Sequence, residues 1–213
     1  MNRCVNIDWL EVFCAEQAQN AILDANYYRL LGYDVRVRDY GTPQYRDMFT
    51  IWRNGFPFLE IRRNPYSLKA NGGIFNPNDC HIRLSNRSCY DVSPINDLRK
   101  FLITFQYSLK SLSRIDICLD FNRFDYGQLP AQFLRAYMRG KVSKINQCNI
   151  SAHGKDSFAE RVWNSVKWGS VSSPISTKLY CKSLELSQVH EKLYIRDAWK
   201  LSGLDVSKPV WRV

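Results

Sequence analysis

The stretch RIDICLDF, residues 114–121, decides the fold. Apolar and polar side chains alternate strictly along it, which is the two-residue period of a β-strand with one face toward a core. On this pattern the side chains that face the core are Ile115, Ile117, Leu119 and Phe121. Asp116, Cys118 and Asp120 then share the opposite face, so this strand presents two carboxylates on a single side.

The segments around this strand predict hairpins and few crossover helices. Runs rich in β-branched and aromatic residues lie on either side of the Asn54-Gly55 step, which is a strong β-hairpin signal. We expect strands over 4–13, 35–40, 45–53, 56–62, 80–84, 145–152, 160–170, 176–182 and 209–213, and helices over 15–31, 93–109, 130–139 and 184–201. This order favours an α+β fold, with antiparallel sheets covered by helices mainly on one face, over a doubly wound parallel sheet.

Length and composition limit the class of protein. The 213 residues suffice for one domain or for two α+β halves, at about 1–110 and 111–213. The mean hydropathy is −0.37, and no apolar run approaches the roughly 20 residues that span a bilayer, which excludes a membrane-spanning protein. The net charge is +10, divided as +3 and +7 between the two halves, and this balance fits a polyanion such as nucleic acid.

Cysteine and histidine usage excludes the common metal and disulfide frameworks. The seven cysteines contain no C-x-x-C pair, so the sequence predicts neither a zinc ribbon nor a disulfide scaffold, but reduced thiols in a cytoplasmic protein. The three histidines are too far apart in sequence for a two-histidine metal motif. His153, beside Gly154 in an expected loop, is either an accessory acid or phosphate contact, or a plain surface histidine.

The two aspartates of the 114–121 strand have two interpretations. They either lie on a solvated outer face, or one of them binds a divalent cation, because Mg²⁺ and Mn²⁺ prefer carboxylate oxygens. Residues four apart on a strand are roughly 13 Å apart. Asp116 and Asp120 therefore cannot both bind one ion unless the strand bends, and one of them would serve as an ion-pair or outer partner.

The stretch STKLYCK, residues 176–182, is built in the same way. Leu179 is expected to face the core, and Lys178, Tyr180 and Lys182 the opposite side. The lysines either protect a sheet edge or activate a nucleophilic tyrosine, since nearby ammonium groups favour the phenolate over a phenol of pKa about 10. Glu185, just beyond the strand, offers a third carboxylate.

Basic and aromatic side chains alternate in the expected meander between residues 35 and 62. This mixture suits single-stranded nucleic acid, because bases stack on aromatic rings and phosphates bind arginine. The alternative is a set of core aromatics with a solvated basic face. Together with Lys178, the candidate DNA-binding residues are Arg36, Arg38, Arg46, Trp52 and Arg53.

Taken together, these segments resemble the replication initiation factor family, which comprises rolling-circle plasmid and phage initiators and related relaxases of mobile elements. Its pattern R-x-D-x-x-x-D is matched by residues 114–120, and its later Y-x-K-x-x-E by residues 180–185. A Gly-Ser step lies between them at 169–170, and the segments VNIDWL (5–10) and VWRV (210–213) also resemble the family. The resemblance covers nearly the whole chain.

The resemblance implies a metal-dependent nicking enzyme with the relaxase or rolling-circle initiator nuclease fold. Tyr180 would attack one DNA strand and leave a 5′-phosphotyrosine and a free 3′-OH, and a later 3′-OH would rejoin the strand. Lys182 would contact the scissile phosphate or tune the tyrosine, and Asp116, Asp120 and Glu185 would hold Mg²⁺ or Mn²⁺. The implied partners are single-stranded or hairpin origin DNA and a host or element-encoded helicase.

Two features depart from the family pattern. Cys181 stands where relatives often carry an acid, and relatives continue beyond the VWRV segment into an acidic residue. We therefore expect residues 1–213 to be a single catalytic, origin-nicking domain truncated at its C-terminus. Two other hypotheses remain: a nucleic-acid-binding α+β module without catalysis, and a degenerate relative that acts as a partner protein.

Overall fold

The structure of the chain is a computed structural model. It describes residues 2–17, 25–38, 41–66, 69–70, 73–74, 76, 78–142, 149–156, 161–170, 173–188 and 192–213. The chain divides into two compact units: an N-terminal unit, Asn6–Ile117, and a C-terminal unit that combines Met1–Val5 with Cys118–Val213. The expected class, α+β with antiparallel sheet, is confirmed in both units.

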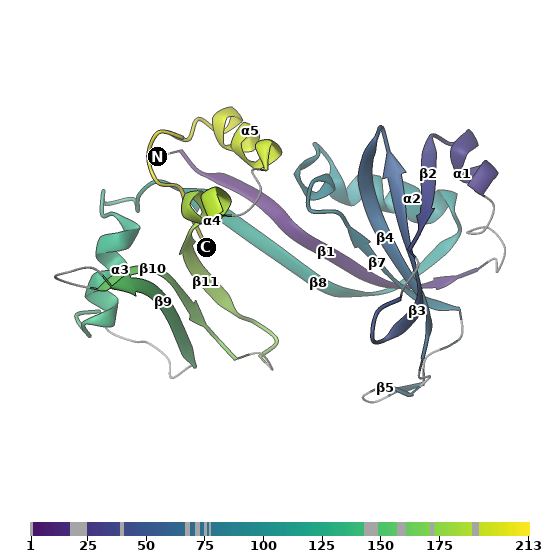
Figure 1. Cartoon of the computed structure of the whole chain (residues 1–213), viewed down its shortest axis with the longest axis horizontal. Coiled ribbons are helices and arrows are strands. Elements are labelled where there is room, and N and C mark those ends of the chain that lie inside the picture. Colours follow the sequence, from purple (N-terminus) through teal and green to yellow (C-terminus); the bar gives the residue numbers. More distant parts are fainter. Residues whose placement is uncertain are drawn as a thin grey trace. The chain divides into compact units, whose positions relative to one another are not determined.

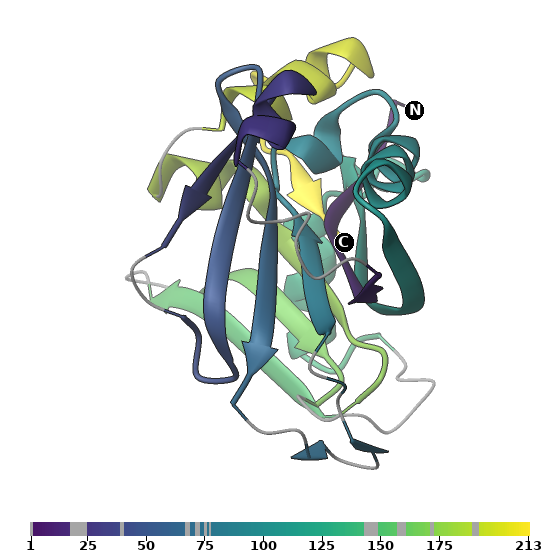
Figure 2. The same ribbon diagram turned by 90° about the vertical axis from the view of Figure 1, so that its right-hand side faces the viewer.

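The N-terminal unit is an antiparallel sheet with helices on one face (Figures 1 and 2). In order across the sheet, the strands are β2 (Tyr33–Val37), β3 (Tyr45–Arg53), β4 (Phe56–Pro65), β7 (Asp79–Leu84), β1 (Cys4–Glu16) and β8 (Tyr107–Phe121). The other elements are α1 (Ala25–Leu30), the two-stranded β5 (Lys69–Ala70) and β6 (Gly73–Ile74), the 3-10 turn Ser88–Tyr90 and α2 (Pro94–Thr104).

The core of this unit lies between α2 and the sheet. Ile51, Ile61 and Ile82 come from three neighbouring strands and are fully buried against Phe101 of α2. Each large apolar side chain removed from water contributes roughly 1.5–3 kcal/mol. The hairpin between β3 and β4 turns at Asn54-Gly55, as predicted, because both residues adopt the left-handed φ that a tight two-residue turn requires (51° and 78°).

The C-terminal unit has its own sheet segment, with α3 packed on one face (Figure 1). Its strands, in order, are the end of β8, β12 (Trp211–Arg212), β11 (Thr177–Cys181), β10 (Arg161–Trp168) and β9 (Ile150–Asp156), and its helices are α3 (Pro130–Met138), α4 (Lys182–Gln188) and α5 (Leu193–Leu201). Leu134 of α3 packs against Val166 and Leu179 of the sheet, and all three are buried.

Several predicted boundaries are wrong. The first strand continues to Glu16, where a helix was expected, and α1 covers only Ala25–Leu30 of the expected range. Helix α2 ends at Thr104, so β8 begins earlier, at Tyr107. The last expected helix is two helices, and the expected loop at 153–154 belongs to β9.

Residues 114–121 form a strand, at the end of β8, as predicted. Only two of the four apolar side chains expected to face a core do so. Ile117 is 67% exposed and Ile115 is 39% exposed, whereas Cys118 and Asp120 are buried. Leu119 packs against the core of the C-terminal unit, and Phe121 is buried in it. Near its C-terminal end the strand is covered on both faces, so polar and apolar positions are buried there alike.

The thiols of the described residues agree with the expected reduced state. Six cysteines are free, and five of them are buried; Cys148 lies outside the described residues. Burial raises the pKa of Cys14 and of Cys89 to about 12, which keeps both thiols protonated and unreactive. No helix in the part of the chain that the structure describes is both long and apolar enough to cross a membrane.

Candidate active site

A row of five polar residues crosses the sheet of the C-terminal unit. Strand register places Asp120 opposite Arg212, Arg212 opposite Tyr180, Tyr180 opposite Ser165, and Ser165 opposite His153. Side chains directly opposite one another on paired strands point to the same face. This polar row therefore runs from β8 to β9 on the face opposite the α3 core.

The polar row begins with a buried ion pair. Arg212 donates from Nε to Oδ1 of Asp120 at 2.6 Å and from Nη2 to Oδ2 at 2.7 Å. Trp199 of α5 adds a third hydrogen bond, from Nε1 to Oδ2, at 2.6 Å. Asp120 is 0% exposed and Arg212 2%. A two-point arginine–carboxylate contact is rigid as well as strong, so it fixes β12 against β8 next to Tyr180.

Tyr180 lies in the middle of the row, is half-buried and has two cations near its ring. The Nζ atom of Lys178 lies 4.4 Å from the centre of its ring, and that of Lys182 lies 5.5 Å away. Leu179 is buried in the α3 core, which confirms the predicted facing of β11. Lys178 is exposed, whereas Lys182 is buried and pairs with Oε2 of Glu185 at 2.5 Å.

The three carboxylates expected to bind metal do not form one site. Asp116 accepts two hydrogen bonds from Arg114, at 2.8 and 2.5 Å, and belongs to the N-terminal unit. Asp120 has both oxygens occupied and no exposure, and Glu185 faces Lys182. Within the described ranges, no cluster of three His, Cys, Asp or Glu side chains could hold a metal ion. The donor set does not fit an ion held by all three acids.

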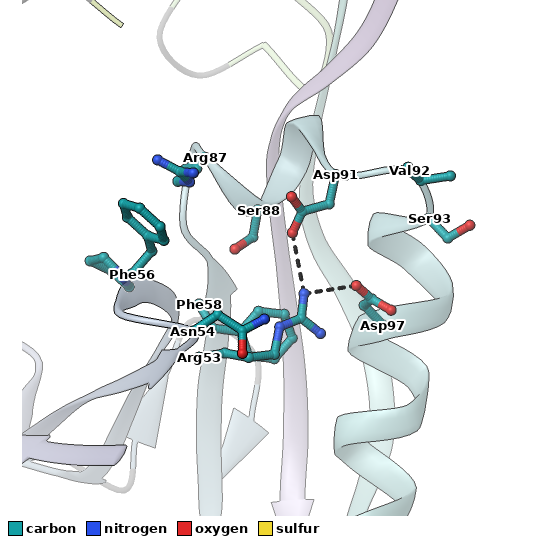
Figure 3. A pocket seen from close by; sticks show the side chains of 11 residues that line it. Arg53, Asn54, Phe56, Phe58, Arg87, Ser88, Asp91, Val92, Ser93 and Asp97 are labelled. Atoms are coloured by element: carbon teal, nitrogen blue, oxygen red, sulfur yellow. Dashed lines mark hydrogen bonds and ion pairs between the residues drawn. The ribbon is translucent and has the colours of Figure 1, made fainter. Parts of the chain in front are cut away.

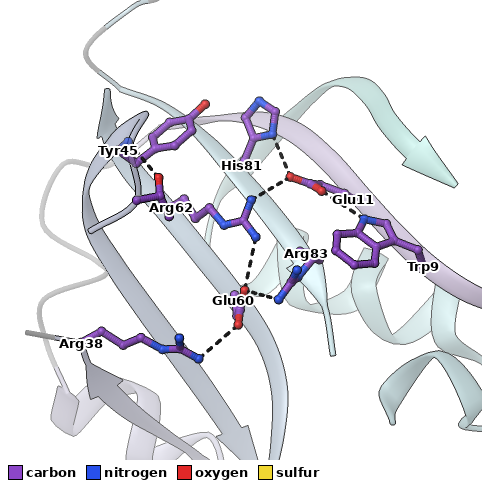
Figure 4. A network of polar contacts seen from close by, with 9 residues as sticks. Trp9, Glu11, Arg38, Tyr45, Glu60, Arg62, His81 and Arg83 are labelled. Atoms are coloured by element: carbon purple, nitrogen blue, oxygen red, sulfur yellow. Dashed lines mark hydrogen bonds and ion pairs between the residues drawn. The ribbon is translucent and has the colours of Figure 1, made fainter. Parts of the chain in front are cut away.

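The N-terminal unit also carries a polar sheet face, opposite its α2 core (Figure 4). Glu60 accepts from Arg38, Arg62 and Arg83 at 3.3, 3.4 and 2.6 Å. Glu11 contacts Arg62, His81 and the Trp9 indole at 3.3, 3.2 and 3.1 Å. The hydrogen bond from His81 is the main reason why the pKa of Glu11 is lowered, against the effect of burial. Glu60 and Glu11 together hold the arginines of this face in place.

Three of the predicted DNA-binding residues line one cavity on this face, of about 430 Å³. They are Arg36, Arg38 and Trp52, and the cavity also contacts Glu60 and Arg83. The Arg36 guanidinium lies 3.6 Å from the centre of the Trp52 ring. The Nε1 atom of Trp52 is buried without a hydrogen-bond partner among the described residues. Two exposed arginines beside an aromatic ring suit a ligand that carries phosphates and bases.

The structure separates the other two arginines from this cavity. Arg53 lines a different pocket, where Asp91 and Asp97 accept its hydrogen bonds at 3.2 and 2.8 Å (Figure 3). Burial would lower the pKa of Arg53, but the hydrogen bond and charge of Asp97 raise it. Arg53 therefore joins β3 to the start of α2. Arg46 is exposed and lies 5.4 Å from the ring of Tyr66.

Sequence reasoning missed several polar residues of these faces. Arg212 lies far along the chain from Asp120, and only the pairing of β12 with β8 brings them together. Trp9 has the guanidinium groups of Arg83 and Arg114 at 4.4 and 4.3 Å from its ring centre. The available signal for Trp9 was the alternation along β1, which places it on the polar face with Glu11.

Comparison with known proteins supports the fold. No family model matches the chain, and no curated protein sequence does. Among solved structures, the chain is similar to the rolling circle replication initiator protein from Geobacillus stearothermophilus. The TM-score is 0.50 at 12% sequence identity, over 99% of this chain and 74% of that one. The fold is therefore similar to that of a rolling-circle replication initiator, arranged around two polar sheet faces.

Proposed function

We propose that the chain initiates rolling-circle replication, or acts as a relaxase, by nicking and rejoining one DNA strand through Tyr180. The observation that carries the proposal is the position of Tyr180: two lysine Nζ atoms lie within 5.5 Å of its ring centre, and on β12 its register partner is Arg212 of the buried Asp120–Arg212 pair. A phenol beside two ammonium groups is suited to attack a phosphodiester, because cations favour the phenolate, and an exposed one can hold the phosphate and offset its developing charge. The similarity to a replication initiator fold supports the same class of reaction.

In the proposed reaction, the phenolic oxygen of Tyr180 forms a bond to phosphorus and the bond from phosphorus to the 3′-oxygen breaks. The DNA is then linked to the protein through a 5′-phosphotyrosine and carries a free 3′-OH. Because one phosphodiester replaces another, a 3′-OH can reverse the reaction and rejoin the strand. Lys178 is exposed and can reach the phosphate, whereas the buried Lys182 acts beside the ring.

A requirement for Mg²⁺ or Mn²⁺ stays a prediction. In the described arrangement an ion would have to displace Arg114 from Asp116 or Lys182 from Glu185, and Asp120 offers no unoccupied oxygen. Cleavage of DNA can therefore be compared in the presence of Mg²⁺, of Mn²⁺ and of a chelator. Equal cleavage under all three conditions would show that these carboxylates do not act through a metal ion.

The polar face of the N-terminal unit is the proposed surface for single-stranded DNA. Arg36 and Arg38 are exposed beside Trp52, so phosphates and stacked bases can be bound in one cavity. The proposed partner is therefore single-stranded or hairpin origin DNA. The same face would also serve a binding module without catalysis. Only the nicking enzyme needs Tyr180, so an experiment on Tyr180 distinguishes the two functions.

The decisive experiment uses a pool of single-stranded oligonucleotides with a randomised centre. The protein is incubated with the pool and either Mg²⁺ or Mn²⁺, and covalent adducts are isolated on a denaturing gel and sequenced. We expect an adduct with the wild type and none with Tyr180→Phe. Tyr126→Phe is the matched control, because Tyr126 belongs to the same unit and is fully exposed.

Two outcomes would contradict the proposal. An adduct that persists in Tyr180→Phe would move the nucleophile elsewhere. DNA binding by the wild type without any adduct would favour the non-catalytic module. Loss of the adduct in Tyr126→Phe as well would show that the phenol at position 180 has no special role.

A further inference from the structure

The polar row ends on a histidine that the proposed nicking step has not used. His153 lies on β9, the last strand of the sheet order, and is exposed. Its register partner is Ser165, whose other partner is Tyr180. Figure 1 shows β9, β10 and β11 side by side in the same unit. His153 and Tyr180 therefore point to the same face from strands separated by a single strand.

The spacing between the two side chains fits one phosphodiester. Neighbouring strands lie about 4.7–4.9 Å apart, which puts the Cα atoms of His153 and Tyr180 roughly 10 Å apart. The residue between them, Ser165, is small and 8% exposed, so it forms a low floor below the two longer side chains. Both a phenol and an imidazole can thus reach a phosphate that lies over β10.

The pairing of β9 with β10 is irregular next to His153. The register shifts between Trp163 and Ser165, so β10 carries an irregularity opposite the 153–154 step. Such bulges re-aim side chains and are over-represented beside active sites. A side chain on Gly154 would lie 2.6 Å from the carbonyl oxygen of Val162, so glycine allows the close approach of β9 to β10 here.

The other histidine of the described residues, His81, does not offer this arrangement. His81 contacts Glu11 in the N-terminal unit, and His190 lies outside the described residues. Lysine and arginine in the site can hold a phosphate but are poor proton donors at neutral pH, whereas imidazole gives and takes protons there. Departure of a 3′-oxygen needs a proton, because an alkoxide is a poor leaving group.

We infer that His153 is a further catalytic residue, the general acid for the departing 3′-oxygen; this inference rests on the proposed function of Tyr180. As the Tyr180 oxygen bonds to phosphorus and the phosphorus–O3′ bond breaks, the imidazolium of His153 gives its proton to the 3′-oxygen. The phenol proton passes to solvent water. In the rejoining reaction the neutral imidazole takes the proton from the attacking 3′-OH.

The test compares two leaving groups. An oligonucleotide captured as an adduct by the wild type is resynthesised with sulfur in place of the bridging 3′-oxygen at the nick. A thiol has a pKa of about 8.5, so a 3′-thiolate leaves without a proton donor. We expect His153→Ala and His153→Gln to slow single-turnover cleavage of the oxygen substrate by about 10²–10⁴-fold. On the sulfur substrate, both variants should cleave at a rate close to that of the wild type.

The matched control is Ser151→Ala, because Ser151 is exposed on the same strand and the same face, two residues away. It should keep both rates. Equal slowing of His153→Ala on both substrates would overturn the role as a general acid, as would an unchanged rate on the oxygen substrate. Failure of the proposed function itself looks different: Tyr180→Phe would then cleave, or the wild type would cleave neither substrate.

Discussion

The two polar sheet faces differ in how their cations are neutralised. In the C-terminal unit each buried cation has one acid: Arg212 has Asp120, and Lys182 has Glu185. In the N-terminal unit one acid, Glu60, is shared by three arginines. The first face holds its buried cations in single ion pairs, whereas the second shares its acids among several arginines, since Arg62 also pairs with Glu11 and Arg36 with Asp34.

The difference teaches which chemistry each face suits. A pair such as Asp120–Arg212, with both members buried, defines a position but offers no charge to a ligand. Exposed Arg36 and Arg38 beside Trp52 define a position less sharply and, on the proposed function, offer charge and a ring to several nucleotides. On the proposed function, the residues that act on one phosphate and the residues that attract many of them lie in separate units of the chain.

The largest effect is expected on breaking the buried pair. Asp120→Ala leaves Arg212 buried and uncompensated, and removing one partner of a buried pair costs about 3–5 kcal/mol. Asp116→Ala is the matched control on the same strand: its pair with Arg114 is exposed, so its loss should cost about 0–1 kcal/mol. Urea unfolding of the three proteins measures the difference. Similar free energies of unfolding for both variants would show that the Asp120–Arg212 pair does not anchor the C-terminal unit.

An intermediate effect is expected at the cavity of the N-terminal unit. Trp52→Ala should weaken binding of single-stranded oligonucleotides by about 1–3 kcal/mol, the value of one stacked base, and leave the cleavage rate at saturating DNA unchanged. The matched control is Tyr66→Ala, because Tyr66 is an exposed ring that also has an arginine, Arg46, near it but does not line the cavity. Fluorescence anisotropy measures both affinities. Equal losses would show that exposed rings bind DNA wherever they lie.

The sequence predicted what depends on local pattern. The Asn54-Gly55 turn follows from the φ that its two residues tolerate, and the facing of Leu179 and Tyr180 follows from strict alternation in a strand with one covered face. The same rule failed for Ile115 and Ile117, which are exposed. Alternation tells which residues share a face, but not which face another element covers.

The polar row could not be predicted, because it depends on register between strands. Asp120 and Arg212 are brought together by β12, which has only two residues and a weak local signal. The sequence predicts a loop at His153-Gly154, whereas in the structure β9 continues through both residues opposite a register shift in β10. Tyr180 could be proposed as a nucleophile from its neighbours in sequence, whereas its partners across the sheet could not be predicted.

The smallest expected effect concerns Glu11, on the polar face of the N-terminal unit, and is measured as the pH dependence of the free energy of unfolding. The pKa of Glu11 lies below its usual value of 4.5, mainly because of the hydrogen bond from His81. Between the two pKa values the unfolded chain binds more protons than the folded chain, so the stabilisation is complete above about 4.5 and is lost as pH falls through the folded pKa. Glu11→Gln should remove this part of the acid dependence, on the order of 1 kcal/mol.

Urea unfolding between pH 7 and pH 3 measures this effect. The wild type should lose free energy of unfolding more steeply below about pH 4.5 than Glu11→Gln. His81→Ala should show an intermediate slope, because it removes the largest cause of the lowered pKa and keeps the contact with Arg62. If Glu11→Gln keeps the full acid slope, then Glu11 is not held charged by its neighbours. Glu60 alone would then hold the arginines of this face in place. The contrast with the C-terminal unit, where Arg212 and Lys182 each have an acid of their own, would be sharper still.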